Sequence, residues 1–422
     1  MNGSSLNRKH RVLLVATHPV QYAAPTFRRL ADRPEVDILV AYCSLQGAER
    51  GVDPEFDVSV AWDVPLLDGY PWLLVPNRSL RPGLGRFWGL VNFGLWKLVR
   101  TGNFDAVVVY GYASCSVWIA LLAAKSRGTP ILLSTDTANL RNLGSGWWWK
   151  RLVKRPIIRL IYLKVADLLL IPSTATRRFL LSIGVPEERL VTTHYVVNND
   201  FFTQAASEKK QGRVTARKAW DVPEKALVIL YCAKLTPWKR PQDLLQSFAT
   251  LHANRSNELP PVYLVFAGDG PLGESLRVEA ATLGISERVR FLGFVNQSAL
   301  PATYAASDVL VLPSQFDAWG LVVNEAMICG VPVVVSDQVG AGADLVIPGE
   351  TGEVYPAGDV GVLGEILSRL LADPEELQRQ GQVGCQRMES WSPREHVQGM
   401  LRAIEAAVTM KRRAKSGGRS HT

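Results

Sequence analysis

The sequence predicts an α/β protein made of two Rossmann-like, doubly wound parallel-sheet domains that face each other across a cleft. Two observations support this. Short apolar runs alternate with helix-like stretches, as expected for parallel strands with helices on both faces. The alternation then restarts after a polar, charged stretch at 204–217, which we interpret as a linker. Ligands bind at the carboxyl ends of such sheets and at domain interfaces, so the site is expected in the cleft.

Ten apolar runs are predicted to be strands, because β-branched and aliphatic residues without charges are typical of strands buried on both faces. The first half contributes Val12–Ala16, Asp37–Tyr42, Ala106–Tyr110, Pro130–Ser134 and Asp167–Ile171. The second half contributes Ala226–Ala233, Pro261–Ala267, Val289–Leu292, Val309–Leu312 and Pro332–Ser336. Each half therefore has the pattern of one doubly wound sheet.

The domain boundaries follow from these patterns. We expect an amino-terminal domain at 1–203 and a carboxyl-terminal, ligand-binding domain at 204–390. An amphipathic helix at 391–410 is expected to pack back on the first domain, and the basic tail at 411–422 is expected to be disordered.

The uncharged stretch from Ala106 to Ala124 is long enough to be considered as a membrane span. Gly111, Tyr112 and Ser114 interrupt it between a β-rich half and a helix-like half. We therefore predict a buried strand, a loop and a helix in place of a span.

The five cysteines occur singly, without a CxxC pair or a Cys/His cluster, and each lies in or beside an apolar run. They are interpreted as reduced core residues, which argues against structural zinc and indicates a reducing compartment, the cytoplasm.

The net charge of +8 is clustered in the Trp147–Arg159 segment and in the tail from Lys411, which indicates anionic partners. Two interpretations of Trp147–Arg159 stay open: core aromatic residues followed by a solvated basic helix, or an anchor on an anionic membrane surface, which would place the protein peripherally on the inner face of the membrane. Nucleic acid is not expected as a partner, because no recognition module accompanies the charge.

The segment Ser314–Pro332 is the most specific motif. A strand ends in a loop that carries Asp317, and Gly320 then opens a helix that carries Glu325. A glycine at a helix start lets backbone N–H groups point at an anion, and the helix dipole adds to this effect. Gly320, Leu321 and Val322 are therefore candidates to hold a diphosphate through their backbone.

A second motif, Ala233–Pro241, follows the first strand of the second half. Its Lys234 and Lys239 stand in a strand-to-helix loop where both can point into the cleft. Fixed cations stabilise the negative charge that develops on a departing diphosphate.

With these motifs the sequence resembles glycosyltransferase family 4, the retaining enzymes of GT-B fold, over nearly the whole chain and most densely from Leu227 to Tyr355. The family usually has Arg and Lys in the first loop, where this chain has Lys234 and Lys239. It usually has two glutamates, where this chain has Asp317 and Glu325 with the spacing of eight positions kept. Further matching segments are Val196–Asp200, Gly268–Pro271, Phe291–Val295 and Glu325–Pro332.

The resemblance implies a role for each matching position. Lys234 and Lys239 would bind the diphosphate of a nucleotide-sugar donor, together with the backbone of Gly320, Leu321 and Val322. Asp317 would contact hydroxyls of the transferred sugar, and Glu325 would bind the ribose hydroxyls. The backbone near Phe294 and Val295 would hold the base.

The resemblance also implies a mechanism in which the leaving diphosphate accepts the proton of the acceptor, so that no protein nucleophile is required. The Asp-x-Asp metal motif of the other glycosyltransferase fold is not in the sequence. We therefore expect neither a metal nor a cofactor, with the nucleotide sugar as co-substrate and a glycan or lipid-linked molecule as acceptor.

The first half matches the family less well, because the glycine pair usual after the first strand is replaced by Thr17–Tyr22. His18 in this loop and Asp136 after a later strand are candidates to orient the acceptor or the sugar. The structural alternatives are a loop histidine and a turn or cap aspartate.

Three other functions are alternatives to sugar transfer. A same-fold epimerase would interconvert nucleotide sugars without an acceptor. An α-glucan phosphorylase would need a far longer chain and a lysine that holds pyridoxal phosphate. A non-catalytic nucleotide-sugar or glycan-binding subunit is suggested by the change to Asp317 and opposed by the retention of Lys234, Lys239 and Glu325.

Overall fold

The structure is a computed structural model, and it describes residues 9–48, 51–53, 58–60, 62–137, 156–207, 209–256 and 258–417. Most of the Trp147–Arg159 segment, for which two interpretations stayed open, lies outside these residues, from Trp147 to Arg155. The chain divides into two compact units that are not consecutive in sequence. Unit 1 comprises 1–50, 65–195 and 393–422, and unit 2 comprises 51–64 and 196–392.

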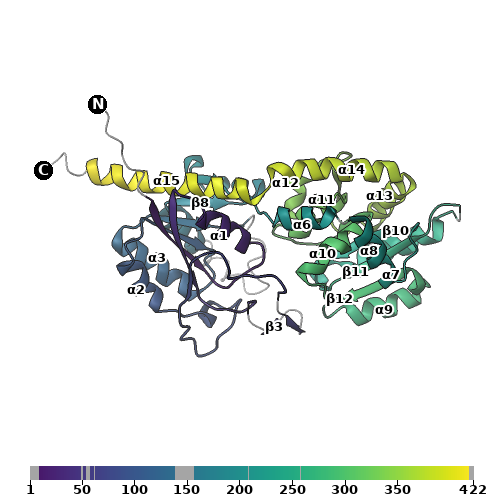
Figure 1. Ribbon diagram of the computed structural model, residues 1–422, viewed down its shortest axis with the longest axis horizontal. Coiled ribbons are helices and arrows are strands. Elements are labelled where there is room, and N and C mark those ends of the chain that lie inside the picture. Colours follow the sequence, from purple (N-terminus) through teal and green to yellow (C-terminus); the bar gives the residue numbers. More distant parts are fainter. Residues whose placement is uncertain are drawn as a thin grey trace. The chain divides into compact units, whose positions relative to one another are not determined.

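Unit 1 contains a seven-stranded parallel sheet in the order β5-β2-β1-β6-β7-β8-β9 (Figure 1). Its strands are β1 (His10–Ala16), β2 (Val36–Tyr42), β5 (Trp72–Leu74), β6 (Ala106–Tyr110), β7 (Ile131–Ser134), β8 (Leu168–Ile171) and β9 (Leu190–Thr192). Its helices include α1 (Ala24–Ala31), η1 (Phe87–Gly89), α2 (Gly94–Thr101), α3 (Cys115–Arg127), η2 (Ile161–Val165), α5 (Thr174–Ser182), η3 (Glu187–Arg189) and α15 (Pro393–Gly417).

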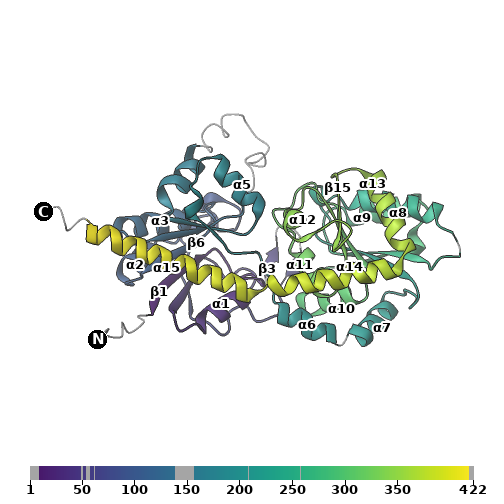
Figure 2. The same ribbon diagram turned by 90° about the horizontal axis from the view of Figure 1, so that it is seen from above.

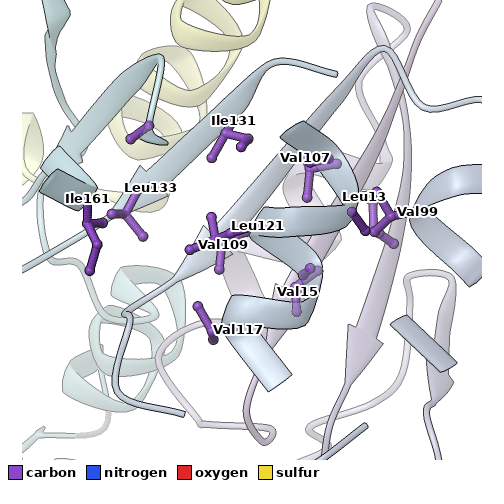
Figure 3. Packing of buried hydrophobic residues seen from close by; sticks show 14 of the residues in the cluster. Leu13, Val15, Val99, Val107, Val109, Val117, Leu121, Ile131, Leu133 and Ile161 are labelled. Atoms are coloured by element: carbon purple, nitrogen blue, oxygen red, sulfur yellow. The ribbon is translucent and has the colours of Figure 1, made fainter. Parts of the chain in front are cut away.

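The strands are apolar along their whole length because helices cover both faces of the sheet, as the sequence predicted. Alternate residues of a strand point to opposite faces. Leu13 and Val15 of β1 pack with Val117 and Leu121 of α3, as Figure 3 shows. Val12 and Leu14 belong to the opposite core, to which α1 and α15 contribute the residues Phe27, Leu30, Met400 and Ile404.

The uncharged stretch at 106–124 forms β6 and the first part of α3, which confirms the prediction of a buried strand, a loop and a helix. α3 ends at Gly128, whose φ of 64° is the left-handed conformation common after helices. Within the described ranges, no helix is both long and apolar enough to span a bilayer.

Unit 2 contains a six-stranded parallel sheet in the order β12-β11-β10-β13-β14-β15, together with the two-stranded ladder β3-β4. The strands are β3 (Gly51–Asp53), β4 (Val58–Val60), β10 (Leu227–Cys232), β11 (Val262–Ala267), β12 (Val289–Gly293), β13 (Val309–Leu312), β14 (Val333–Ser336) and β15 (Gly352–Tyr355). The structure thus has the two predicted Rossmann-like sheets, of which unit 2 carries the second.

The helices of unit 2 lie on both faces of its sheet, as the two views in Figures 1 and 2 show. They include α6 (Asn199–Ser207), α7 (Lys209–Ala219), η4 (Pro237–Lys239), α8 (Pro241–Asn254), α9 (Gly273–Thr282), η5 (Ser286–Arg288), η6 (Gln297–Ala299), α10 (Leu300–Ala305), α11 (Leu321–Ile328), α12 (Gly340–Leu345), α13 (Val360–Ala372), α14 (Pro374–Arg387) and η7 (Met388–Ser390).

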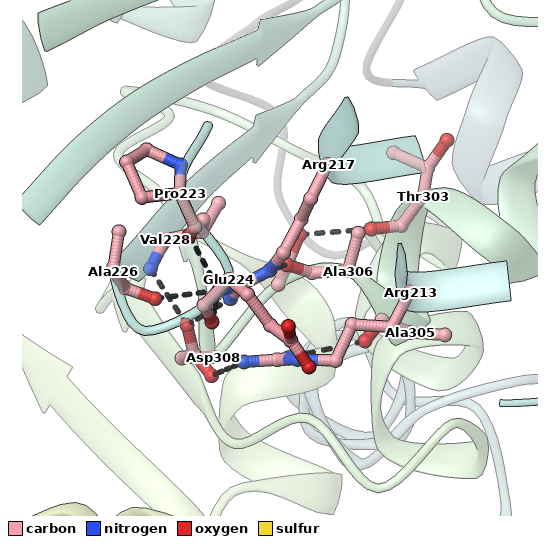
Figure 4. Close-up of polar contacts among 11 residues, drawn as sticks. Arg213, Arg217, Pro223, Glu224, Ala226, Val228, Thr303, Ala305, Ala306 and Asp308 are labelled. Carbon is pink, nitrogen blue, oxygen red and sulfur yellow. Dashed lines mark hydrogen bonds and ion pairs between the residues drawn. The ribbon is translucent and has the colours of Figure 1, made fainter. Parts of the chain in front are cut away.

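The prediction of a linker at 204–217 is wrong, because α6 and α7 occupy most of this stretch. Arg217 of α7 is only 1% exposed and its guanidinium group binds the Asp308 carboxylate at 2.7 Å. It also donates to the carbonyls of Glu224, Ala226 and Ala306 (Figure 4). The charged composition of this stretch predicted exposure to solvent, but its Arg217 is buried and paired with a carboxylate and carbonyl groups.

Two smaller predictions also fail. The helix predicted to end at 410 continues as α15 to Gly417, so 411–417 is not a disordered tail. Cys385 is exposed, although it was expected in the core; Cys43, Cys232 and Cys329 are buried, and Cys115 is half-buried.

Candidate functional site

The strand order of the unit 2 sheet reverses between the neighbouring strands β10 and β13, since β10 continues to β11 and β13 continues to β14. In open α/β sheets, ligands bind at the carboxyl ends of the strands beside such a reversal, which is called the switch point of the sheet. The loops that follow the two strands, 233–240 and 313–320, carry Lys234, Lys239 and Asp317. The fold therefore brings the two predicted motifs, which are far apart in sequence, to one edge of the sheet.

Side-chain and backbone contacts join these two loops. The Lys239 ammonium group forms an ion pair with the Asp317 carboxylate, and both side chains are mostly buried, at 18% and 16% exposure. The amide of Gln315 donates to the Trp238 carbonyl at 2.8 Å. Lys234 is half-buried in the same loop as Lys239. A mostly buried cation and a carboxylate thus lie side by side at the switch point.

Gly320 precedes α11, which confirms the predicted helix start. Its φ of 91° is left-handed, and a Cβ atom there would lie 3.0 Å from side-chain carbons of both Leu312 and Val339. The backbone conformation therefore strongly favours glycine, and the tight space around the position adds to this preference. The helix start leaves the backbone N–H groups of Leu321 and Val322 without acceptors inside the helix.

Two residues that sequence reasoning missed hold the Asp317 loop in place. Trp319 is buried, and its indole N–H donates to the Asn324 side chain at 2.7 Å. Its ring also stacks on Trp391, with the ring centroids 5.9 Å apart. Both Trp319 and Asn324 lie inside the Ser314–Pro332 motif. Their residue types alone do not indicate that they support the loop, so the sequence did not identify this role.

Glu325 lies in the second turn of α11 and is 6% exposed. Its carboxylate accepts a 2.6 Å hydrogen bond from the Tyr304 hydroxyl of α10. Burial raises the pKa of Glu325 to about 7, and hydrogen bonds from Tyr304 and Gln297 oppose this shift. A carboxyl group held by two neutral donors and kept from water is suited to binding hydroxyl groups. Tyr304 escaped prediction because it stands in an apolar helical stretch.

The loop after β12 carries Phe294 and Val295, both half-buried. The Trp62 ring of the 51–64 segment meets the Phe294 ring edge-on, with the centroids 6.0 Å apart. The backbone N–H of Ser298 donates to the Asp63 carboxylate at 3.1 Å. The loop leads directly into η6, which carries the Glu325 partner Gln297, so the predicted base loop and Glu325 belong to one connected region.

The two candidates in unit 1 follow β1 and β7. The His18 ring lies 2.9 Å from the Thr17 hydroxyl, next to the β1–β6 reversal of the unit 1 sheet. Asp136 is exposed, and its carboxylate accepts a 3.1 Å hydrogen bond from the Tyr195 hydroxyl. Tyr22, in the loop of His18, has a pKa raised to about 12 by burial and by the Asp136 charge. The Tyr22 ring also meets the Tyr195 ring edge-on, with the centroids 6.1 Å apart, so Tyr195 joins Asp136 to the loop of His18.

The structure offers no metal centre among the residues it describes, since no three His, Cys, Asp or Glu side chains there gather closely enough. The predicted anion-binding groups, the two lysines and the start of α11, lie at the unit 2 switch point.

The buried Glu325 predicts a pH-dependent stability. The pKa of this group is raised on folding from 4.5 to about 7, so the folded protein binds more protons between these values and loses stability as pH rises through them. The substitution Glu325→Gln removes this penalty. At pH 8 we expect the free energy of unfolding of the variant to exceed that of the wild type by about 3 kcal/mol at most, so the variant should unfold at a higher temperature. At pH 5 the two proteins should unfold at similar temperatures.

The measurement is thermal unfolding of both proteins across this pH range. Glu365→Gln, at an exposed position of α13, is the matched control and should behave like the wild type at every pH. A Glu325→Gln variant with the same pH dependence as the wild type would contradict the assigned burial penalty.

Family models match most of the chain. The model described as "Glycosyl transferases group 1" matches residues 213–387, and the model described as "Glycosyl transferase 4-like domain" matches residues 7–195. The matched ranges are close to the two structural units.

Two relatives share one description. D-inositol 3-phosphate glycosyltransferase of Salinispora arenicola is 34% identical over 41% of this chain and 39% of its own length. The protein of the same description from Thermobispora bispora is 28% identical over 88% of this chain and 89% of its own. The match to the first of these relatives therefore spans well under two thirds of that protein. Among solved structures, Anabaena HepE in complex with UDP has a TM-score of 0.69 at 18% identity, covering 94% of this chain and all of its own.

Proposed function

The chain belongs to the GT-B glycosyltransferases of the family 4 type, and on this premise we propose that it transfers a hexose-type sugar from a nucleoside diphosphate donor with retention of anomeric configuration. The acceptor is proposed to be a polysaccharide precursor, a glycolipid or a related glycoconjugate of the cell envelope. The observation that carries the proposal is the convergence of both motifs beside β10 and β13, where Lys239 meets Asp317.

The donor diphosphate is assigned to Lys234, Lys239 and the start of α11. Charge that develops on a leaving group is best stabilised by fixed donors in a site that excludes water. The mostly buried Lys239 and the backbone N–H groups of Leu321 and Val322 have this character, and Gly320 supplies the close backbone approach. These groups provide charge stabilisation of the kind a metal ion gives in other transferases, so we propose metal-independent transfer.

The remaining donor contacts are assigned along the same edge of the sheet. Glu325 would accept hydrogen bonds from the ribose hydroxyls, a role supported by its burial and by the two donors that orient it. Asp317 would contact the transferred sugar, and the backbone at Phe294 and Val295 would hold the base. HepE binds UDP, which makes UDP-sugars the first donors to try.

The acceptor side is assigned to unit 1, with His18 and Asp136 as groups that orient the acceptor or the sugar. Their positions after β1 and β7, at the carboxyl edge of the sheet, support this proposal. We propose that the leaving diphosphate takes the proton of the acceptor hydroxyl, so that the bond to the new oxygen forms on the face from which the diphosphate departs.

The five free cysteines support a cytoplasmic location. A peripheral position on the inner face of the membrane, with Trp147–Arg159 as an attachment segment, would suit a lipid-linked acceptor. The segment combines Trp with Lys and Arg, which favour the headgroup region.

The test is donor-dependent release of nucleoside diphosphate with a pool of glycan and lipid acceptors, followed by NMR of the product. The proposal expects release only when an acceptor is present, and a product with the donor's anomeric configuration. An inverted product would contradict the retaining mechanism. Conversion of the donor without any acceptor would instead identify an epimerase, and donor binding without turnover would identify a non-catalytic subunit.

A further inference from the structure

Exposed aromatic side chains are concentrated in one part of unit 1. Among the described residues, seven Phe and Trp side chains are exposed, and five of them lie between positions 72 and 96. They are Trp72, Phe87, Trp88, Phe93 and Trp96, and the exposed Leu74 and Leu80 lie in the same stretch. Large apolar groups are exposed together in this way when they meet a partner or a membrane.

The same stretch has a one-sided charge. Between Asp68 and Asp105 the sequence contains no acidic residue and five basic ones, Arg78, Arg81, Arg86, Lys97 and Arg100. All five are exposed. We call these five basic residues and the seven apolar residues the 72–100 surface.

Hydrogen bonds join the two ends of the loop at the centre of the 72–100 surface, residues 77–79 and 88–91. The Ser79 hydroxyl donates to the Trp88 carbonyl, and the Arg78 amide donates to the Val91 carbonyl at 2.9 Å. The Asn77 side chain donates to the Gly89 carbonyl, also at 2.9 Å. These bonds close the loop between the edge strand β5 and α2, and they hold η1, with Phe87 and Trp88, beside the start of the loop.

We propose that the 72–100 surface binds the headgroup region of an anionic phospholipid membrane. Trp and Phe favour the boundary between headgroups and acyl chains, and Arg and Lys contribute attraction to anionic lipids. This inference is independent of the transfer reaction, and it involves residues other than Trp147–Arg159.

Charge decides between a membrane and a second copy of the chain. A twofold contact would place this surface against itself and bring two sets of five cations together, which is unfavourable. An anionic lipid surface complements the same charges. The short edge strand β5 offers only three residues for pairing with another strand, which also disfavours association of copies.

The test is co-sedimentation of the full chain with vesicles of phosphatidylcholine alone and of phosphatidylcholine with phosphatidylglycerol. We expect binding to the anionic vesicles that weakens with added salt, and much weaker binding to the neutral ones. Arg81→Gln with Arg86→Gln should lower the affinity by roughly 25-fold, at about fivefold for each basic residue. Phe87→Ser with Trp88→Ser should lower it by at least about tenfold.

The matched control is Lys225→Gln with Val278→Ser, which changes an exposed basic and an exposed apolar residue of unit 2. It should bind like the wild type, and all variants should unfold at the wild-type temperature. The proposal is overturned if the wild type does not bind anionic vesicles, or if the surface variants bind as tightly as the control. It is also overturned if the wild type is a dimer in solution and Phe87→Ser with Trp88→Ser converts it to a monomer.

Discussion

Replacing Lys239 with alanine is expected to lower the turnover number of sugar transfer by a factor of about 10² to 10³. Lys239 is mostly buried and pairs with Asp317 at the switch point of the unit 2 sheet. Under the proposed mechanism its ammonium group stabilises charge that grows on the diphosphate as the sugar leaves. Such a group acts more strongly on the transition state than on the bound donor, so turnover should fall more than donor affinity.

Steady-state kinetics of donor-dependent diphosphate release measures this effect. Lys239→Arg keeps the charge and should recover part of the turnover, although its geometry differs. Lys225→Ala removes an exposed lysine of the same unit and should leave turnover unchanged. If Lys239→Ala kept more than about a third of the wild-type turnover, the lysine would have no part in stabilising the leaving group.

Replacing Arg217 with methionine is expected to destabilise unit 2 by about 3–5 kcal/mol. The guanidinium group is buried and binds Asp308, whose carboxylate also accepts from the Val228 amide at 2.7 Å. Burial lowers the pKa of Arg217, and the Asp308 charge opposes that shift. Removing the arginine takes a donor away from the Asp308 carboxylate and from four carbonyl groups, those of Pro223, Glu224, Ala226 and Ala306. Arg217 itself is only 1% exposed, so water replaces few of these bonds.

Arg213→Ala is the matched control, because Arg213 pairs with the same Asp308 but its side chain is 28% exposed. Its removal should cost about 1 kcal/mol or less. Urea and thermal unfolding of the purified chains compare the two variants. Equal losses for Arg213→Ala and Arg217→Met would show that the buried pair contributes no more than the exposed one.

The sequence predicted those strands whose burial is visible in their composition. Runs such as Val12–Ala16 and Val309–Leu312 are uncharged because helices cover both faces of the sheet, so composition alone identified them as strands. The edge strands β5 and β9 were not predicted, because three residues at a sheet edge produce no distinctive pattern.

The charged helix α7 was not predicted for another reason. α7 has a polar sequence, and its single buried arginine is stabilised by carbonyl groups from 223–226 and by Asp308. These partners become neighbours only when the chain folds, so local pattern could not distinguish α7 from a solvated linker. The 51–64 segment is similar, because its place in unit 2 depends on contacts of Trp62 and Asp63 with the distant loop 294–298.

The candidate site was predictable where backbone geometry and charge constrain the residue type. Gly320 must have a positive φ, and Lys239 and Asp317 follow strands that become neighbours in the sheet. The surroundings of Glu325 were not predictable. Tyr304 comes from another helix, and its hydroxyl contact depends on how α10 packs beside α11.

The most direct test of the central claim, that unit 2 binds a nucleotide sugar, is saturation-transfer NMR with a panel of UDP-, GDP- and ADP-sugars. The wild type is compared with Glu325→Ala, and Glu365→Ala is the surface control. We predict that one class of donor binds the wild type and the control, with transfer to its ribose protons, and that Glu325→Ala does not bind it. If no donor binds the wild type, or if Glu325→Ala binds equally well, the proposed donor site is wrong, although the GT-B fold remains.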